Sequence, residues 1–173
     1  MLGVLSNIPI DARTVLTRDE QLRAAVDRVR DALELIQSLD PRRLVRLRRD
    51  IDQISIVDDL RPQVVGLYGL GSRTCYLAAQ HVQAELPARI ALTIVHEATH
   101  ARLDRLHLPK WGTVTARSEW RAFVEELSFA ERLPRGLFRE LDVYIAKRRR
   151  YIAGLSNRTA TTPLGGIGIA PRR

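Results

Sequence analysis

The chain has 173 residues, of which 45% are hydrophobic and 28% charged, so it suits one compact domain and excludes a long disordered protein. Its formal net charge of +8 arises mainly at residues 101–150, with 12 basic and 7 acidic side chains, and at 151–173, with 3 basic and no acidic ones. This basic end, which includes RRRY (148–151), could contact an anionic partner, although a simple compositional bias towards arginine is the favoured explanation.

The single cysteine, Cys75, excludes an internal disulfide and a thiolate-rich metal cage, so a metal site would have to use imidazole and carboxylate ligands. We expect Cys75 to be a small core residue, because no base stands beside it in a motif. Neither a signal peptide nor an apolar stretch of about 18 residues is recognisable, so we expect no membrane span and a cytoplasmic location.

Two N-terminal helices are predicted over residues 17–50. The first covers 17–38, where apolar residues recur at helical spacing and Thr17 with Glu20 can form a capping box. The second, PRRLVRLRRD, begins at Pro41 and sets two leucines against five arginines. A solvated arginine face is favoured there over a nucleic-acid-binding helix.

Residues 54–79 change to β-branched residues and turn formers, which predicts two or three short strands at 54–57, 64–70 and 74–79. Glycines 69 and 71 would form the turn of a hairpin. Further helices are expected at 87–108, 115–133 and 137–153, the last one basic. The sequence thus predicts a single α+β domain over 1–156, with a short, mainly antiparallel sheet packed against helices, and a flexible basic tail at 157–173.

The motif H-E-x-x-H lies in the mostly apolar helix expected at 87–108. At about 100° per residue, His96 and His100 project only about 40° apart, so both imidazoles can reach one ion. Glu97 points to the edge of such a site, where it could touch a metal-bound water. Because a helix that is apolar around most of its circumference belongs in the interior, these polar residues need partners.

The segment VHEATHARL, followed by S-E-W-R-A-F-V-E-E-L-S-F-A, resembles the zincin metallopeptidases, and within them the compact gluzincins, whose third ligand is a glutamate on the next helix. The similarity runs from about residue 64 to 134. One departure is Arg102, where the extended zincin pattern often has an apolar residue. The resemblance implies a zincin-like helical core, a zinc ion and peptide hydrolysis.

Glu119 is our choice for the third ligand, because the loop at 109–115 lets its helix fold back across the first one. Glu126 projects about 20° from Glu119 and could accept a hydrogen bond from a ligand histidine. His107 lies about 10.5 Å further along the helix than His100, too far for a shared ion. Asp104 is expected in a surface ion pair with an arginine, and Glu125 in solvent.

The resulting hypothesis is a small soluble zinc peptidase in which His96, His100 and Glu119 bind Zn²⁺ and Glu97 is the general base that acts on a water. Candidate donors to the developing oxyanion are Tyr68, Tyr144, Tyr151 and His107, and the strand at 74–77 could pair with a peptide substrate. The alternative is a basic nucleic-acid- or protein-binding module with a structural or degenerate metal site. An iron site with the same ligands is weaker, and a di-iron bundle lacks a second E-x-x-H.

Overall fold

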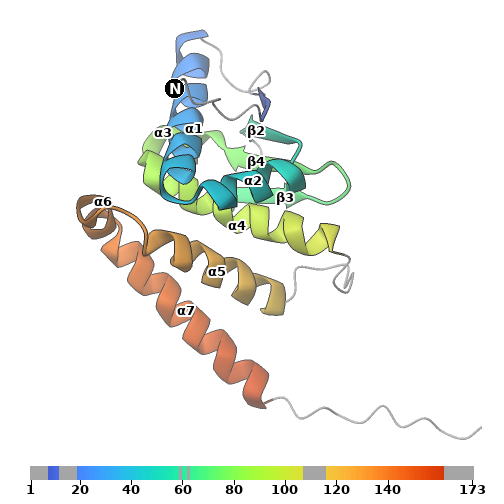
Figure 1. Cartoon of the computed structure of the whole chain (residues 1–173), viewed down its shortest axis with the longest axis vertical. Coiled ribbons are helices and arrows are strands. Elements are labelled where there is room, and N and C mark those ends of the chain that lie inside the picture. The colour runs from blue at the N-terminus through green and yellow to red at the C-terminus, as the bar shows by residue number, and fades with distance from the viewer. Residues whose placement is uncertain (1–7, 12–18, 59, 62, 107–115, 162–173) are drawn as a thin grey trace, which may run out of the picture.

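The computed structural model describes residues 8–11, 19–58, 60–61, 63–106 and 116–161. In that part the chain forms a small sheet with helices beside it and further helices layered below it (Figure 1). The elements follow in the order β1 (Ile10–Asp11), α1 (Asp19–Leu39), α2 (Pro41–Asp50), β2 (Gln53–Val57), β3 (Gly66–Gly69), β4 (Thr74–Ala78), α3 (Ala79–Ala84), α4 (Pro87–Arg105), α5 (Ala116–Ala130), α6 (Arg135–Glu140) and α7 (Asp142–Thr161).

The sheet is mixed, and the expected mainly antiparallel arrangement is wrong. Its strand order is β1-β2-β4-β3, in which β2 is parallel to both β1 and β4 and only the β3–β4 hairpin is antiparallel. After β2 the chain forms β3 at the edge of the sheet, and the hairpin then places β4 between β3 and β2. The strand expected at 74–77 to pair with a peptide therefore has both edges occupied, and β3 is an edge strand in its place.

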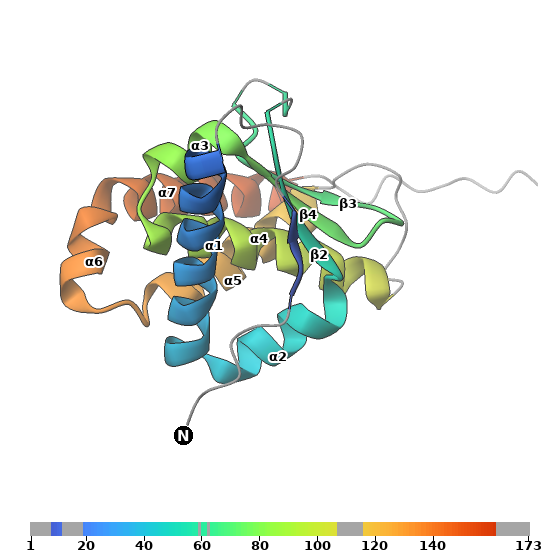
Figure 2. The same cartoon turned by 90° about the horizontal axis from the view of Figure 1, so that it is seen from above.

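Helix α4 forms the centre of the molecule. It packs against α1 and α2, runs beside β3, and carries α5 on its far side (Figure 1). All of its side chains from 88 to 95 are buried. Pro87 starts the helix at a position where the missing N–H costs nothing, as the sequence predicts. Turned by 90°, Figure 2 shows α1 beside the strands and α4 running behind them.

The expected helices are present with changed ends. Helix α1 spans 19–39, so the proposed cap at Thr17 lies outside the described residues. Helix α4 is described to Arg105, and α5 spans 116–130. Among the described residues, no helix combines the length and the apolar character that a membrane crossing requires.

The single basic helix expected at 137–153 is wrong, because the chain forms two helices there. Helix α6 ends at Glu140, and α7 begins after Leu141, whose buried side chain anchors the junction in the core. Helix α7 continues to Thr161, so residues 157–161 of the expected tail are helical. The remainder of that tail, 162–173, lies outside the described residues.

The arginine-rich helix α2 is not simply a solvated face. Arg43 is buried. Its guanidinium donates to the carboxylate of Asp40, the residue that caps the same helix, at 3.1 Å, and to the carboxylate of Glu125 of α5 at 2.7 Å. The expectation that Glu125 is solvated is therefore wrong. This ion pair ties α2 to α5 across the end of the core, and the exposed arginine beside it, Arg42, faces outwards.

Candidate metal centre

The two histidines of the motif lie one turn apart on α4 and face α5. Their Nε2 atoms are 3.3 Å apart, and both rings are largely shielded from solvent. The helix is regular over both positions, so the spacing of four residues alone aligns the rings. Their position near the C-terminal half of α4 places them where α5 folds back across it (Figure 1).

Glu119 completes a group of three donors. It stands in the first turn of α5, and its carboxylate reaches both rings, with one oxygen 3.5 Å from His96 Nε2 and the other 3.1 Å from His100 Nε2. One donor atom from each residue lies within 4.8 Å of the others. The structure thus brings together the three residues that the sequence analysis selected.

These distances fit the donor set of a small divalent cation. Zinc binds imidazole nitrogen and carboxylate oxygen at about 2.0–2.2 Å, so two ligands of one tetrahedral ion lie roughly 3.4 Å apart. Here the two nitrogens are 3.3 Å apart, and each nitrogen has a different oxygen of Glu119 near it, at 3.1 Å for His100 and 3.5 Å for His96. Two neutral imidazoles and one carboxylate would hold such an ion and leave one position for water or substrate.

The outer nitrogen of His96 is held by a second carboxylate. Glu126 of α5 is buried, and its Oε2 lies 3.1 Å from His96 Nδ1. The hydroxyl of Tyr144, from α7, donates to the other oxygen of Glu126, and Arg148 Nε donates to that hydroxyl at 2.7 Å. A carboxylate on Nδ1 fixes the ring orientation and leaves Nε2 free to bind a metal.

The electrostatics of the metal-free site follow from this crowding of acids. Burial alone would lower the pKa of His96, but hydrogen bonds to Glu119 and Glu126 outweigh it and raise the pKa to about 9. Burial alone would raise the pKa of Glu119, but hydrogen bonds to His100 and His96 lower it to about 2. A proton on His96 therefore occupies the place that a bound cation would take.

Glu97 lies on the sheet side of the histidines. Its side chain is buried, and its carboxylate accepts a hydrogen bond from the backbone N–H of Tyr68 in β3. Gly66 permits this approach, because a Cβ there would lie 3.1 Å from Glu97 Oε1 and 2.6 Å from Thr93 Cγ2. Burial raises the pKa of Glu97, against the opposing charges of His96 and His100.

An aromatic and basic wall closes the site on the side of α7. The ring of Phe123 lies 4.5 Å from the ring of His96, and the ring of Tyr151 lies 5.1 Å from Phe123 in an edge-on arrangement. The guanidinium of Arg148 stacks over Phe123 at 4.5 Å. Neither residue was predicted for the site, because the packing of α5 on α4 brings Phe123 to His96 and the packing of α7 on α5 brings Arg148 to Phe123.

The four candidate oxyanion donors differ in whether their polar group already has a hydrogen-bond partner. The hydroxyl of Tyr68 donates to Asp104 at 3.2 Å and that of Tyr144 donates to Glu126, so both are engaged. Tyr151 is 47% exposed, and within the described part of the chain its hydroxyl has no hydrogen-bond partner. His107 lies outside the described residues. Among the described residues Asp104 accepts from Tyr68 and forms no ion pair with an arginine, so the expected arginine pair is wrong there.

A buried cluster of polar side chains near the site was not predicted from the sequence. Arg89 of α4 donates to Thr93 Oγ1 at 3.1 Å, and His81 Nε2 lies 3.0 Å from the same hydroxyl. The guanidinium of Arg89 stacks on the ring of Tyr144, 3.5 Å from its centroid. Burial, with the nearby charge of Arg89, lowers the pKa of His81 to about 4, so this ring is neutral. The signal available in the sequence was an arginine inside an otherwise apolar stretch.

Cys75 lies in the core, and burial raises the pKa of its thiol well above the ordinary value, as befits an unreactive residue. Among the described residues, this centre combines two imidazoles, the carboxylate of Glu119 and two buried acids, Glu97 and Glu126. Comparisons of the chain with protein-family models, with curated proteins and with solved structures found no match.

Proposed function

We propose that this chain is a zinc-dependent peptidase with a zincin-like core, acting in the cytoplasm. The observation that carries the proposal is the meeting of His96 Nε2, His100 Nε2 and the Glu119 carboxylate: the two nitrogens are 3.3 Å apart, and the two carboxylate oxygens lie 3.5 Å from the first nitrogen and 3.1 Å from the second. Nothing in the packing of two helices requires three good metal ligands to meet at the separation set by one ion. The buried partner of His96, Glu126, adds the support that such ligands need.

The chain's own residues divide the work. His96, His100 and Glu119 would hold Zn²⁺, which when bound lowers the pKa of a water and polarises a carbonyl. Glu97 would accept the proton of the attacking water and donate it to the leaving amine. Its burial supports this role, because a carboxyl whose pKa is raised by burial is a better base and then a better acid near neutral pH.

Strand β3 is suited to hold an extended peptide. In the β3–β4 ladder, Val65 accepts from the N–H of Ala78, and alternation then turns the backbone groups of Gly66 and Tyr68 away from β4. The N–H of Tyr68 bonds to Glu97, so these outward groups lie next to the proposed base. A substrate that added to this edge would place its own backbone beside the centre.

Tyr151 is our choice for the donor to the developing oxyanion. Its ring packs on Phe123, which contacts His96, so the hydroxyl is carried on the wall of the site. Tyr68 and Tyr144 are committed to Asp104 and Glu126. Its partial exposure gives the hydroxyl room to turn towards a bound carbonyl.

The test combines metal content with turnover. Protein purified without an affinity tag should carry about one zinc per chain by elemental analysis, and His96→Ala should lose it. Glu97→Gln should keep the zinc and lose cleavage of a mixture of unstructured peptides by about 10²-fold or more, measured by mass spectrometry. Glu140→Gln, a change at an exposed glutamate of α6, is the matched control and should keep both.

The same variants separate the peptidase from a basic binding module. A module with a structural zinc would keep its partner affinity in Glu97→Gln and show no peptide cleavage in any form. The arginines of α2 favour this second function less than their number indicates, because Arg43 and Arg49 are held by carboxylates. Absence of zinc after the metal is supplied at neutral pH would overturn both descriptions of the site.

A further inference from the structure

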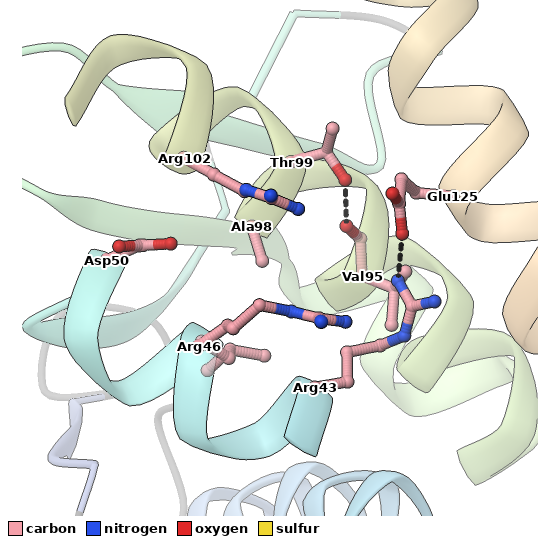
Figure 3. Close-up of a pocket in the computed structure, with 9 residues that line it drawn as sticks. Arg43, Arg46, Asp50, Val95, Ala98, Thr99, Arg102 and Glu125 are labelled. Atoms are coloured by element: carbon pink, nitrogen blue, oxygen red, sulfur yellow. Dashed lines mark hydrogen bonds and ion pairs between the residues drawn. The ribbon is translucent and has the colours of Figure 1, made fainter. Parts of the chain in front are cut away.

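We propose that a small cavity between α2, α4 and α5 is a binding site for a phosphate group. The cavity has a volume of about 20 Å³ and is half-enclosed, and Figure 3 shows the side chains from the three helices that line it. Its charged lining consists of Arg43, Arg46, Asp50, Arg102 and Glu125. Nothing in the peptidase proposal uses these residues, so the inference stands apart from it.

Both carboxylates of the lining already have arginine partners. Glu125 bonds to Arg43 at 2.7 Å. Asp50 is buried and receives Arg49 Nε at 2.8 Å and Arg105 Nε at 2.5 Å. Burial alone would raise the pKa of Asp50, but these two arginines lower it, so the carboxylate is charged and compensated.

The carboxylates that line the cavity do not pair with its other two arginines, Arg46 and Arg102. Both are half-buried, and Figure 3 shows their guanidinium groups extending from α2 and α4 into the same space. Within the part of the chain that the structure describes, neither has a hydrogen-bond or ion-pair partner. Two cations that share a half-enclosed space repel each other, and the local excess of two positive charges matches one phosphate dianion.

The size and chemistry of the cavity define the ligand. A volume of about 20 Å³ holds roughly one or two water-sized groups, which is room for phosphoryl oxygens but not for a larger body. Two planar guanidinium forks can donate paired hydrogen bonds to those oxygens. The remaining atoms of a phosphate monoester would have to project into solvent, so free phosphate and a phosphorylated molecule share one mode of recognition.

The cavity is distinct from the metal centre. On α4 it is lined by Val95, Ala98, Thr99 and Arg102, and successive residues of a helix are turned by about 100°. The lining face therefore points away from the direction in which His96 and His100 project. The hydroxyl of Thr99 donates its proton to the Val95 carbonyl at 2.9 Å, so the arginines are the donors left for the anion in this cavity.

Isothermal titration of the full chain with inorganic phosphate tests the proposal, at an ionic strength held constant with chloride. We expect saturable binding at one site, weakened about tenfold or more by Arg46→Gln and by Arg102→Gln, since each removes hydrogen bonds to a charged group. Arg42→Gln, an exposed change on the same helix, should bind as the parent does. His96→Ala should also bind normally, which excludes phosphate at the metal centre.

A second titration uses glycerol phosphate, a phosphate monoester, in place of inorganic phosphate. Equal affinity for it and for inorganic phosphate supports a site that reads the phosphoryl group alone, and tighter binding of the monoester supports a larger phosphorylated ligand. If a glutamine variant does not fold, Arg46→Lys and Arg102→Lys keep the charge, lose the paired hydrogen bonds and should still weaken binding. Binding that does not exceed the chloride control, or equal binding by the parent and these variants, overturns the proposal.

Discussion

The affinity for zinc should rise steeply with pH, because His96 must lose a proton before it can bind a metal. Glu119 and Glu126 contact the two nitrogens of this ring, and their hydrogen bonds raise its pKa to about 9 in the metal-free protein. At pH 7 such a ring is about 99% protonated, whereas a ring with the ordinary pKa near 6.5 is about 24% protonated. Zinc binding should therefore release close to one proton from this residue.

The expected size of the effect follows from proton competition. Between pH 7 and 8 a pKa of about 9 predicts an increase of about ninefold in apparent zinc affinity, and a pKa near 6.5 predicts about 1.3-fold. The direction is fixed, because the folded protein holds the proton more tightly than free imidazole does and the metal must displace it. Above pH 9 the rise attributable to His96 should level off.

Competition with a chelator of known proton affinity measures this dependence, and calorimetry in buffers of different ionisation enthalpy counts the proton. Glu126→Gln removes one of the carboxylates that hold the proton, so its pH dependence should be shallower than that of the parent. Glu140→Gln should leave the slope unchanged. An affinity that changes by less than about twofold between pH 7 and 8 would refute the reasoning.

Four further outcomes are expected. Tyr144→Phe removes the donor to Glu126 and should weaken zinc binding about tenfold in the same competition assay, with the fold retained. Gly66→Val should lower the free energy of unfolding in urea by about 1–3 kcal/mol, because even a Cβ would lie 2.6 Å from Thr93 Cγ2. Arg43→Met removes the arginine partner of Glu125 and the nearer of the two arginines beside Asp40, and should cost about 2–3 kcal/mol by the same measurement. The metal-free protein should lose at most about 3 kcal/mol of stability between pH 6.5 and 9 as His96 loses its proton.

The controls for these measurements lie in the chain. Arg42→Met, at an exposed position beside Arg43, should change stability by less than about 0.5 kcal/mol. His96→Ala should abolish the loss of stability between pH 6.5 and 9, since the ring whose proton is held is then absent. Zinc binding by Tyr144→Phe as tight as the parent's would show that the Tyr144 hydroxyl is not needed to position Glu126.

The sequence by itself determined the local part of the site. A spacing of four residues on a helix fixes the directions of His96 and His100 without reference to any other segment. The apolar run at 90–95 and the proline before it predicted a buried helix, and the β3–β4 hairpin was visible in its glycines. Glu119 could be selected because a short loop restricts where the next helix can lie.

Only the tertiary structure decided which segments meet over long distances. The parallel pairing of β2 with β4 depends on the path of residues 58–65, and no alternation of side chains records that path. The contacts of Tyr144 with Glu126, and of Arg43 with Glu125, each join two different helices, so the sequence alone could not pair them, and Arg43 and Glu125 each resembled a solvated residue. Sequence periodicity states which face of an element is buried, but the partner across that face is set by how all the elements pack at once.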